Sequence, residues 1–248
     1  MGELSGKVAI VTGASKGVGA AIARLYAEAG AAVAVNYASS KADADRVVEE
    51  IARKGGKAVA IQADVSKRAD VKRLFEETKA RLGPPSILVN NAGVYKFGPL
   101  ETVTEEEFHR HFDLNVLGTI LATQEAVRAF DGAGGSVINL STASSTNPVP
   151  NSVVYSASKG AIDTITRALA LDLADRNIRV NAIAPGMTES EGVAAVGINL
   201  ETAKAMGYVL PMGRLGRPDD IARVALFLAS DHSSWVTGER ITASGGQR

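Results

Sequence analysis

Tyr155 and Lys159 are the residues of this chain whose types and spacing best suit proton transfer. They are four apart at the start of a run of good helix formers that reaches Arg176, so a helix would place both on one face. A phenol titrates near pH ~10, and a neighbouring ammonium or the positive end of a helix dipole favours its ionised form. Such pairs also arise by chance in many helices. The pattern therefore indicates a proton-transfer device only if the rest of the chain builds a site around it.

A glycine-rich turn lies between the first predicted strand, residues 7–12, and the first predicted helix, residues 20–29. In α/β proteins this is where a dinucleotide pyrophosphate meets unpaired helix amides. The spacing of Gly13, Gly17 and Gly19 is G-x-x-x-G-x-G rather than the common G-x-G-x-x-G. An ordinary glycine-rich turn remains the alternative. If a dinucleotide binds, we expect contacts from the whole turn, including Ser15, Lys16 and Val18.

The end of the second predicted strand, residues 31–37, lacks the acidic residue that an NAD-preferring site usually holds there for the ribose diol. The first carboxylate after it is Asp43. Cationic and hydroxyl side chains in the region could instead contact a 2′-phosphate. The candidates are Lys16, Ser39, Ser40 and Lys41, beside Asn36. The sequence thus predicts NADPH rather than NADH as the cofactor.

Two further turns follow predicted strands. The Asp64 carboxylate, in the turn after residues 57–62, could bind the adenine amino group of the cofactor, or it could simply cap that turn. An Asn-Asn-Ala-Gly turn follows residues 86–90 and begins at the last of them. In a doubly wound sheet of order 3-2-1-4-5-6-7, the first and fourth strands flank the topological switch point, so this turn and the glycine turn would line one crevice. The residues expected to contact the cofactor here are Asp64, Val65, Asn91, Ala92 and Gly93.

Strand-like and helix-like segments alternate along the chain. Short β-branched runs without strict alternation indicate buried parallel strands, and the segments between them have helical periodicity. The predicted strands are residues 7–12, 31–37, 57–62, 86–90, 135–140, 178–183 and 239–243. The predicted helices are residues 20–29, 41–54, 67–82, 104–128, 155–176 and 218–230. We expect one α/β domain over residues 1–248, a doubly wound Rossmann-type fold whose mostly parallel seven-stranded sheet is covered by helices on both faces.

Composition excludes several classes of function. The 27 basic and 27 acidic residues give a formal net charge of zero, which argues against nucleic acid or an anionic membrane as the main partner. The chain has no cysteine, so thiol nucleophiles and thiolate metal sites are excluded. His109 and His111 fall on different sides of a helix, and we expect both at the surface rather than at a metal. The N-terminus does not resemble a signal peptide and no apolar run reaches spanning length, so we expect a cytoplasmic protein.

Four motifs in this order resemble the short-chain dehydrogenase/reductase superfamily, and the resemblance spans nearly the whole chain. They are the glycine turn, the turn at residues 90–93, Tyr155-x-x-x-Lys159, and Pro185-Gly186 after the sixth strand. The resemblance implies hydride transfer between a nicotinamide and a carbonyl or alcohol, with Tyr155 as acid/base and Lys159 lowering its pKa. It also implies that Lys159 contacts the nicotinamide ribose and that Asn115 holds a water in the proton relay. On the nicotinamide side, it implies contacts from Pro185, Gly186 and Thr188.

One position departs from the superfamily pattern. A serine normally precedes the tyrosine by thirteen residues, and here that position is Thr142. The threonine hydroxyl can donate a hydrogen bond as a serine does, with a methyl that stiffens χ1. Ser141 would require a slip that reverses the face of the strand, and Ser144 would require the loop to fold back. We favour Thr142, with Ser144 as the second choice.

The predicted substrate loop, about residues 187–212, is rich in glycine and apolar residues. Loops of this length are more often functional than scaffolding. The candidate substrate-facing residues are mostly apolar, which fits a ketone or alcohol on an apolar body, with Arg214 at the edge. They are Tyr95, Phe97, Val149, Val153, Met187, Val193, Val196, Ile198, Met206, Tyr208 and Met212.

The resulting hypothesis is an NADPH-dependent carbonyl reductase that resembles 3-oxoacyl-carrier-protein reductases and, like most of the superfamily, forms a homotetramer through its two long helices and last strand. The alternatives are an NAD-dependent alcohol dehydrogenase, or a member that binds cofactor with weak or no turnover. An epimerase or dehydratase would usually need a larger C-terminal substrate domain than the length allows.

Overall fold

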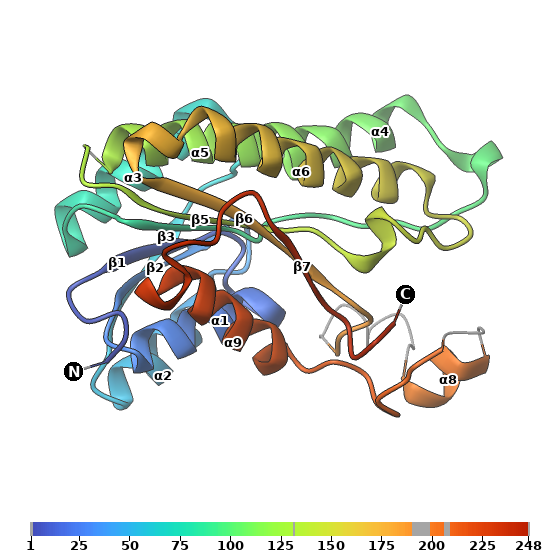
Figure 1. The fold of residues 1–248 in the computed structure, drawn as a ribbon, viewed down its shortest axis with the longest axis horizontal. Helices are drawn as coiled ribbons and strands as arrows, with labels where there is room; N and C mark the ends of the chain where they lie inside the picture. Colours follow the sequence, from blue (N-terminus) through green and yellow to red (C-terminus); the bar gives the residue numbers. More distant parts are fainter. Residues whose placement is uncertain (1, 131, 190–198, 206–208, 248) are drawn as a thin grey trace.

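Seven parallel strands form one sheet in the order β3-β2-β1-β4-β5-β6-β7 (Figure 1). The computed structural model describes residues 2–130, 132–189, 199–205 and 209–247. The strands are β1 Val8–Val11, β2 Ala32–Tyr37, β3 Lys57–Gln62, β4 Ile87–Asn90, β5 Gly135–Leu140, β6 Ile178–Pro185 and β7 Arg240–Ala243. The predicted fold class, strand set and strand order are confirmed.

Helices cover both faces of the sheet, with α1, α2 and α9 in one layer and α3, α4, α5 and α6 in the other (Figure 1). Their bounds are α1 Gly17–Glu28, α2 Lys41–Arg53, α3 Arg68–Leu82, α4 Glu105–His111, α5 Gly118–Ala129, α6 Val153–Asp172 and α9 Pro218–Ala229. Each layer closes its own apolar core, one around Tyr26, Val35 and Ile221 and the other around Leu74, Leu88 and Phe130. Burial on both faces explains why the strands are apolar without alternation.

Shorter elements join the long ones. The single turns of 3-10 helix are η1 Leu100–Thr102, η3 Ala143–Ser145, η4 Ala174–Arg176 and η5 Asp231–Ser233, and a short helix, α8 Leu200–Ala205, lies in the predicted substrate loop. Within the described ranges, no helix is long and apolar enough to span a membrane.

The long helical region predicted for residues 104–128 is confirmed, since α4, a π-helical turn and α5 follow one another without a break from Glu105 to Ala129. It begins as expected, because the Thr104 hydroxyl accepts a hydrogen bond from the amide of Glu107 at 3.2 Å. A π-helical turn, η2 Phe112–Leu117, then separates α4 from α5. The extra residue in this turn accompanies the hydrogen bonds of Asn115 to a neighbouring loop, described below. The Tyr155 helix also ends earlier than expected, at Asp172, and is followed by η4.

The prediction that both histidines lie at the surface is wrong for His111. Its exposed fraction is 0%, whereas His109 is exposed. The Nδ1 atom of His111 lies 2.9 Å from the Glu107 carbonyl oxygen and 3.0 Å from that residue's carboxylate. These polar partners, one turn back on the same helix, allow the imidazole to be buried.

Candidate active site

All seven strands are parallel, so their carboxyl ends meet at one edge of the sheet, which is where ligands bind in open α/β folds. The glycine turn follows β1 at this edge. Gly13 has φ +60, and a Cβ there would lie 2.9 Å from the Cα of Ala92 in the turn after β4. Gly17 also has a positive φ, +57. Glycine adopts these conformations without strain. The close approach to Ala92 shows that the two turns flanking the switch point pack directly on each other, and residues of both line one cavity.

Polar side chains lock these two turns together. The Asn91 amide nitrogen Nδ2 donates to the carbonyls of Thr12 and Gly13, at 2.8 and 2.9 Å. The Thr12 hydroxyl accepts from the backbone amides of Asn91 and Ala92, at 2.9 and 3.0 Å. Asn36 accepts from the Gly13 amide at 3.1 Å. Asn36 and Asn91 thus hold the shape of the site, and Thr12 is a supporting residue that sequence reasoning missed.

A cavity of about 510 Å³ lies over these turns. Most of the predicted cofactor residues line it, together with Tyr37, Ala38, Ala63, Tyr95 and Leu114. The predicted residues in the lining are Gly13, Ser15, Lys16, Gly17, Asn36, Ser39, Ser40, Asp64, Val65, Asn91, Ala92 and Gly93. Val18 and Gly19 are not in the lining and belong to the first turn of α1. The N-cap of that helix, Lys16, makes no side-chain capping bond, so the helix start suits the phosphates of a dinucleotide.

The charges in the cavity favour an anionic ligand near Lys16. Among the described residues of the lining, Lys16 is the one cation and Asp64 the one carboxylate. The Lys16 ammonium lies 3.8 Å from Asp43, a loose pairing on an exposed side chain. Lys41, also predicted to contact a 2′-phosphate, instead pairs with Asp45 at 2.5 Å and is outside the lining. The Asp64 carboxylate accepts from the amide and hydroxyl of Ser66, at 3.1 and 2.7 Å, so it caps a turn and also faces the cavity.

Tyr155 lies in the first turn of α6, largely buried beside the aromatic rings of Tyr95 and Phe97. The ring centroids of Phe97 and Tyr155 are 5.7 Å apart and those of Tyr95 and Tyr155 are 6.3 Å apart, both edge to face. Burial raises the pKa of the Tyr155 phenol, the hydrogen bond with the Thr142 hydroxyl lowers it in part, and Tyr95 raises it further. The phenol is therefore protonated at neutral pH, as an acid that donates to a carbonyl oxygen must be.

Lys159 follows one helical turn later and is 7% exposed. Its ammonium donates to the carbonyl oxygen of Leu140, at the end of β5, at 2.6 Å. Burial lowers the pKa of Lys159 to about 8, and the Asp163 carboxylate opposes this shift. The lysine thus remains mostly charged at neutral pH in an apolar place, where a cation strongly favours a nearby anion.

Asn115 sits in the π-helical turn and fixes the loop after β4. Its Oδ1 accepts from the Val94 amide at 2.8 Å, and its Nδ2 donates to the Val94 carbonyl at 3.0 Å and to the Ser158 hydroxyl at 3.0 Å. π-Bulges commonly occur at functional sites. The asparagine joins the loop that follows the 90–93 turn to the helix that carries Tyr155 and Lys159. Ser158 was not anticipated from the sequence.

Of the three hydroxyls considered for orienting the carbonyl, that of Thr142 is the one whose interaction with the Tyr155 phenol lowers the pKa of Tyr155. Thr142 also accepts from the backbone amide of Ser144 at 3.3 Å. The Ser141 hydroxyl is buried and has no hydrogen-bond partner among the described residues. The geometry thus brings Thr142 to the proton donor, with Ser141 and Ser144 on either side of it in the chain.

The end of β6 supplies the predicted nicotinamide side. The Thr188 hydroxyl donates to the Gly186 carbonyl at 2.9 Å, and the amide of the next residue after Gly186, Met187, donates to the Gln247 side chain at 2.8 Å. A Cβ on Gly186 would lie 2.7 Å from that side chain, so glycine here lets the C-terminal segment close over the strand end. Pro185, Gly186 and Thr188 lie outside the cavity lining.

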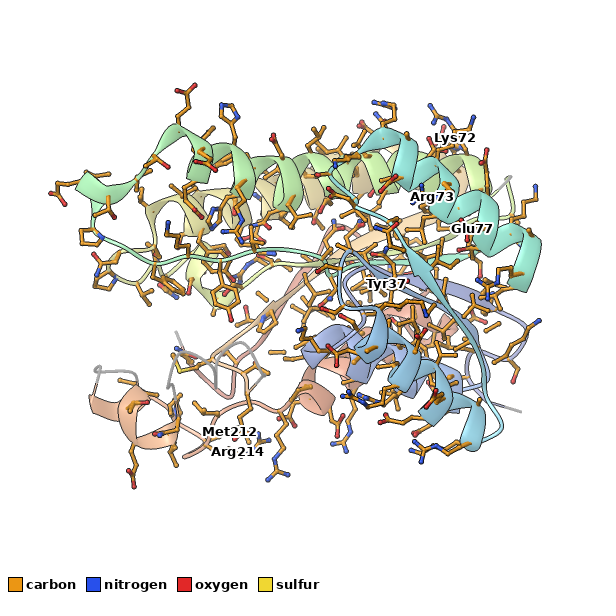
Figure 2. The ribbon with its side chains drawn as sticks, turned by 180° about the vertical axis from the view of Figure 1, so that it is seen from behind. Tyr37, Lys72, Arg73, Glu77, Met212 and Arg214 are labelled. Carbon is orange, nitrogen blue, oxygen red and sulfur yellow. The ribbon has the colours of Figure 1, made fainter. Side chains whose placement is uncertain are left out.

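The substrate loop is only partly described. Val193, Val196, Ile198, Met206 and Tyr208 lie outside the described residues. Figure 2 shows Met212 and Arg214 together on the segment between α8 and α9. Arg214 binds the Asp220 carboxylate at 2.7 and 3.1 Å through both terminal nitrogens. It therefore stabilises the start of α9, and an anionic substrate would have to compete with Asp220 for it.

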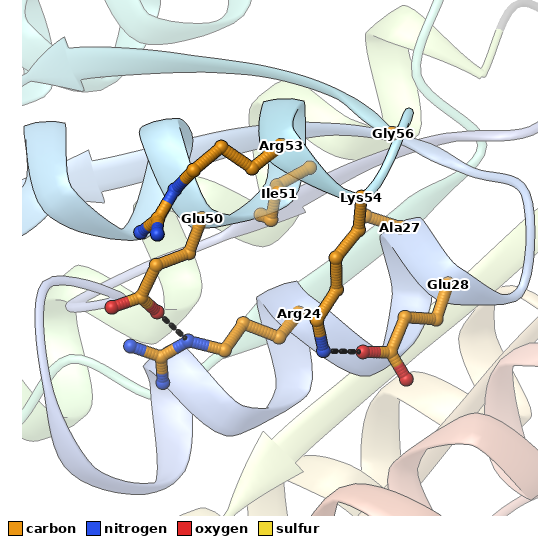
Figure 3. A pocket seen from close by; sticks show the side chains of 8 residues that line it. All are labelled: Arg24, Ala27, Glu28, Glu50, Ile51, Arg53, Lys54 and Gly56. Atoms are coloured by element: carbon orange, nitrogen blue, oxygen red, sulfur yellow. Dashed lines mark hydrogen bonds and ion pairs between the residues drawn. The ribbon is translucent and has the colours of Figure 1, made fainter.

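A second cavity, of about 330 Å³, lies between α1 and α2 on the outside of the molecule (Figure 3). Four of its five charged side chains are paired with one another: Arg24 with Glu50 and Lys54 with Glu28, both at 2.6 Å. The fifth is Arg53, and none of the predicted site residues lines this cavity. The cavity over the glycine turn is therefore the better candidate for the cofactor site. Within the described part of the chain, no cluster of three or more His, Asp or Glu side chains is placed to hold a metal.

Asp163 and Arg240 are two further site neighbours that sequence reasoning missed. Asp163 contacts Arg240 at 2.9 Å, and Arg240 reaches the Thr142 carbonyl at 2.9 Å. A signal for Asp163 was present, since it follows Lys159 by the same four-residue step that separates Lys159 from Tyr155, and residues four apart are neighbours on one helix face. Arg240 gave no local signal, because its partners are far away in the sequence.

The fold, the cavity over the glycine turn, and the Thr142 and Tyr155 hydroxyls together define a nucleotide-dependent oxidoreductase. Comparison with known proteins agrees. A family model described as Enoyl-(Acyl carrier protein) reductase matches residues 13–248. An uncharacterised oxidoreductase of Methylorubrum extorquens is 53% identical over 100% of both chains. Versicolorin reductase 1 of Aspergillus parasiticus is 42% identical, over 98% of this chain and 97% of its own. The chain belongs to the short-chain dehydrogenase/reductase family.

Solved structures extend the similarity. The angucycline C-6 ketoreductase LanV, solved with bound NADP, superposes with a TM-score of 0.91 at 40% identity, over 99% of this chain and 96% of its own. A 7α-hydroxysteroid dehydrogenase, solved with NADH and 7-oxo glycochenodeoxycholic acid, has a TM-score of 0.93 at 37% identity, over 98% of this chain and 95% of its own. The chain is therefore an NAD(P)-dependent oxidoreductase that acts on CH–OH or C=O groups, as predicted.

Proposed function

We propose that this protein reduces a ketone to an alcohol with NADPH. The observation that carries the proposal is the placement of two residues by α6: Tyr155 stands edge-to-face against Tyr95, which lines the cofactor cavity, and the buried Lys159 one turn later bonds the end of β5. Thr142, two residues beyond the end of β5, has a hydroxyl that interacts with the Tyr155 phenol. Two hydroxyls directed at one point can both bond a carbonyl oxygen, one as proton donor and one as orienting group.

The chain's own residues would act as follows. Thr142 holds the carbonyl oxygen next to the phenol of Tyr155, which donates its proton as negative charge develops on that oxygen. The charged Lys159 stabilises the phenolate that remains. Asn115 keeps α6 in register with the loop that follows β4. In this proposal, the water that returns a proton to the site lies beside Asn115. Bound NADPH would supply the hydride.

The residues that would hold the cofactor follow from the cavity. The glycine turn and the start of α1 suit the pyrophosphate, because the N-cap residue of that helix makes no side-chain capping bond and leaves the first helix amides for a ligand. Lys16, Ser39 and Ser40 would bind the 2′-phosphate. Asp64 and Val65 would lie at the adenine, and Pro185, Gly186 and Thr188 at the nicotinamide. Preference for NADPH is supported by Lys16 as the single lining cation within the described residues and by the lack of a carboxylate at the end of β2.

The substrate side is built from aromatic rings. Tyr95 and Phe97 are 41% and 47% exposed and stand edge-on to Tyr155, so they offer an uncovered aromatic surface directly beside the proton donor. Aromatic pairs contribute about 0.5–1.5 kcal/mol beyond their area burial. This wall favours a ketone set in a flat ring system over an open-chain ketone.

The test is a panel of ring and open-chain ketones followed by nicotinamide absorbance with both cofactors. We expect turnover with NADPH, and higher kcat/KM for ring ketones such as tetralones than for aliphatic ketones of similar size. The Lys16→Ala variant should raise KM for NADPH about tenfold and leave NADH almost unchanged, whereas Lys41→Ala, its matched control, should alter neither. Equal efficiency with NADH would contradict the cofactor assignment.

A second candidate is an NAD-dependent alcohol dehydrogenase. The similarity to a hydroxysteroid dehydrogenase solved with NADH favours it, since the same residues can run the reaction in reverse. The same panel distinguishes the two candidates. If the protein oxidises alcohols with NAD faster than it reduces ketones with NADPH, it is the alcohol dehydrogenase.

We further propose that the chain forms one domain and assembles as a homotetramer in the cytoplasm. Exposed apolar side chains on α4, η2 and α6 support the assembly: Phe108, Leu117 and Leu171 are 42%, 42% and 82% exposed. Isolated apolar side chains are ordinary at a surface, but exposed side chains of this size on neighbouring helices suit a subunit contact.

A further inference from the structure

Asp163 is a buried carboxylate immediately behind the catalytic helix turn. It is 5% exposed and lies one turn after Lys159 on α6. Its Oδ2 accepts from Arg240 Nε at 2.9 Å and from the Ser145 hydroxyl at 2.5 Å. Its Oδ1 has no hydrogen-bond partner within the described residues. Burying a charge in this way is unfavourable unless it is paired, so the carboxylate needs Arg240.

Arg240 comes from β7, at the far edge of the sheet, and joins Asp163 to the turn that carries Thr142. Its Nη2 donates to the Thr142 carbonyl at 2.9 Å, to the Ser145 hydroxyl at 3.0 Å and to the Thr146 hydroxyl at 3.3 Å. The guanidinium therefore fixes both ends of η3. The rigid fork of arginine makes these bonds at once, which a lysine ammonium cannot reproduce.

Ser145 completes the cluster. Its hydroxyl lies 2.9 Å from the Thr142 carbonyl and 2.5 Å from Asp163, and its single proton can serve one of these acceptors at a time. The backbone of Thr142 is thus held on one side by a charged network, while its hydroxyl interacts with the Tyr155 phenol. The same carboxylate of Asp163 favours the charged form of Lys159.

We propose that Asp163 and Arg240 are positioning residues for the reaction. Arg240, anchored by Asp163, fixes the Thr142–Thr146 turn and so aims the Thr142 hydroxyl at the oxygen that Tyr155 protonates. This inference rests on the proposed function. It assigns no contact with substrate or cofactor to either residue, and it implies that their removal lowers kcat while leaving cofactor binding intact.

The test is a double-mutant cycle between Arg240→Lys and Thr142→Ala. Arg240→Lys keeps a positive charge beside Asp163, so folding is preserved while the bonds to the Thr142 turn are lost. We expect kcat to fall about 10- to 100-fold, with KM for the ketone and the NADPH dissociation constant within about twofold of wild type. In the Thr142→Ala background, Arg240→Lys should cost less than about twofold, because residues that act through one another are not additive.

Arg179→Ala is the matched control. That arginine is also partly buried and bonds the Ser233 hydroxyl and the Ser230 carbonyl at 2.8 and 3.3 Å, but it lies near the amino end of β6. It should lower the melting temperature without altering kcat. Additive losses in the cycle, or an equal loss of kcat in Arg179→Ala, would overturn the proposal.

A crystal structure of Arg240→Lys provides a readout that does not depend on activity. We expect the 142–146 turn to be displaced and the Thr142 hydroxyl to move away from the Tyr155 phenol. If the turn stays in place, the positioning role is wrong whatever the enzyme's activity. If the turn moves but wild-type protein reduces no ketone, the proposed function fails and the structural role of Arg240 stands.

Discussion

At the scale of single residues, the proposed reduction depends on the hydroxyl of Thr142. That hydroxyl interacts with the Tyr155 phenol and lowers its pKa, while the neighbouring Ser141 hydroxyl is buried and has no hydrogen-bond partner among the described residues. Successive side chains at the end of a strand point to opposite faces of the sheet, so only one of two adjacent hydroxyls can face the phenol. The threonine methyl does not prevent this role.

Thr142→Ala should lower kcat/KM about 10²–10³-fold, the usual loss when one orienting donor is removed from a transition state. Thr142→Ser is the conservative control and should stay within about threefold of wild type. Ser141→Ala and Ser144→Ala should also remain close to wild type. Steady-state kinetics of the four variants tests the assignment of Thr142. Small and equal losses of kcat/KM in the three alanine variants would contradict it.

Lys159 makes stability depend on pH. Its pKa falls from 10.5 to about 8 on folding, so between these values the unfolded chain binds more protons and stability rises with pH. Below pH 8 the buried lysine is charged, and its desolvation lowers the free energy of unfolding by the full amount. Above pH ~10.5 the lysine is neutral in both states, and this penalty is absent.

Lys159→Met should therefore abolish reduction yet stabilise the apo protein at pH 7, by on the order of 1–3 kcal/mol, with the gain shrinking towards pH ~10. Urea unfolding across this range measures it. Lys79→Met, on the exposed side of α3, should show no comparable pH-dependent gain. A variant that is less stable than wild type at pH 7 would show that the lysine's interactions with Leu140 and Asp163 outweigh its desolvation.

At the scale of elements, the strands and most helices could be predicted because burial and turn chemistry are local signals. β3 and β5 begin and end where the apolar runs do, and α9 begins at Pro218 as expected. The π-turn at Phe112–Leu117 could not be predicted, since it reflects the bonds of Asn115 to Val94, a residue on another loop. His111 was misplaced because its polarity suggested the surface, whereas Glu107 provides a partner inside the helix layer.

The packing of the glycine turn on the β4 turn gives a prediction at this scale. Gly13→Ala places a Cβ 2.9 Å from the Ala92 backbone at φ +60, so the turn must shift. NADPH affinity, measured by cofactor fluorescence, should weaken at least about tenfold. Gly55→Ala has a similar backbone strain, at φ +80, but meets nothing within 4 Å. It should lower stability by about 1–2 kcal/mol and leave NADPH binding unchanged; equal effects of the two variants on binding would contradict direct packing of the two turns.

The candidate site was predicted unevenly. The glycine turn, Tyr155, Lys159, Asn115 and Thr142 could be proposed because each matches a position in the sequence pattern of the short-chain dehydrogenase/reductase superfamily.

Their supporting residues could not be proposed in this way. Thr12, Ser158 and Arg240 act through contacts that cross from one element to another, and only a fold can reveal such contacts. The Tyr155–Lys159 relation also differs from expectation, since burial and Thr142 dominate the pKa of Tyr155 and the Lys159 ammonium bonds Leu140 instead.

At the scale of the whole molecule, the single tryptophan reports on assembly. Trp235 is 98% exposed in the isolated chain and lies just before β7, the edge strand expected at a subunit contact. An indole of this size is seldom left in water. In a tetramer its fluorescence should be blue-shifted and resistant to iodide quenching, and light scattering should give four times the 25.7 kDa chain mass. Trp235→Glu should reduce the assembly state; a monomeric wild type with a red, quenchable emission would contradict the tetramer.

The whole mechanism requires that Tyr155 protonates a ketone oxygen while bound NADPH supplies the hydride. The decisive comparison is of kcat/KM for ketone reduction between wild type and Tyr155→Phe, together with NADPH affinity by fluorescence. We expect wild type to consume NADPH only when ketone is present, and Tyr155→Phe to bind NADPH normally but lose at least about 10²–10⁴-fold in kcat/KM. Undiminished reduction by Tyr155→Phe, or NADPH binding without turnover across the whole ketone panel, would contradict this mechanism.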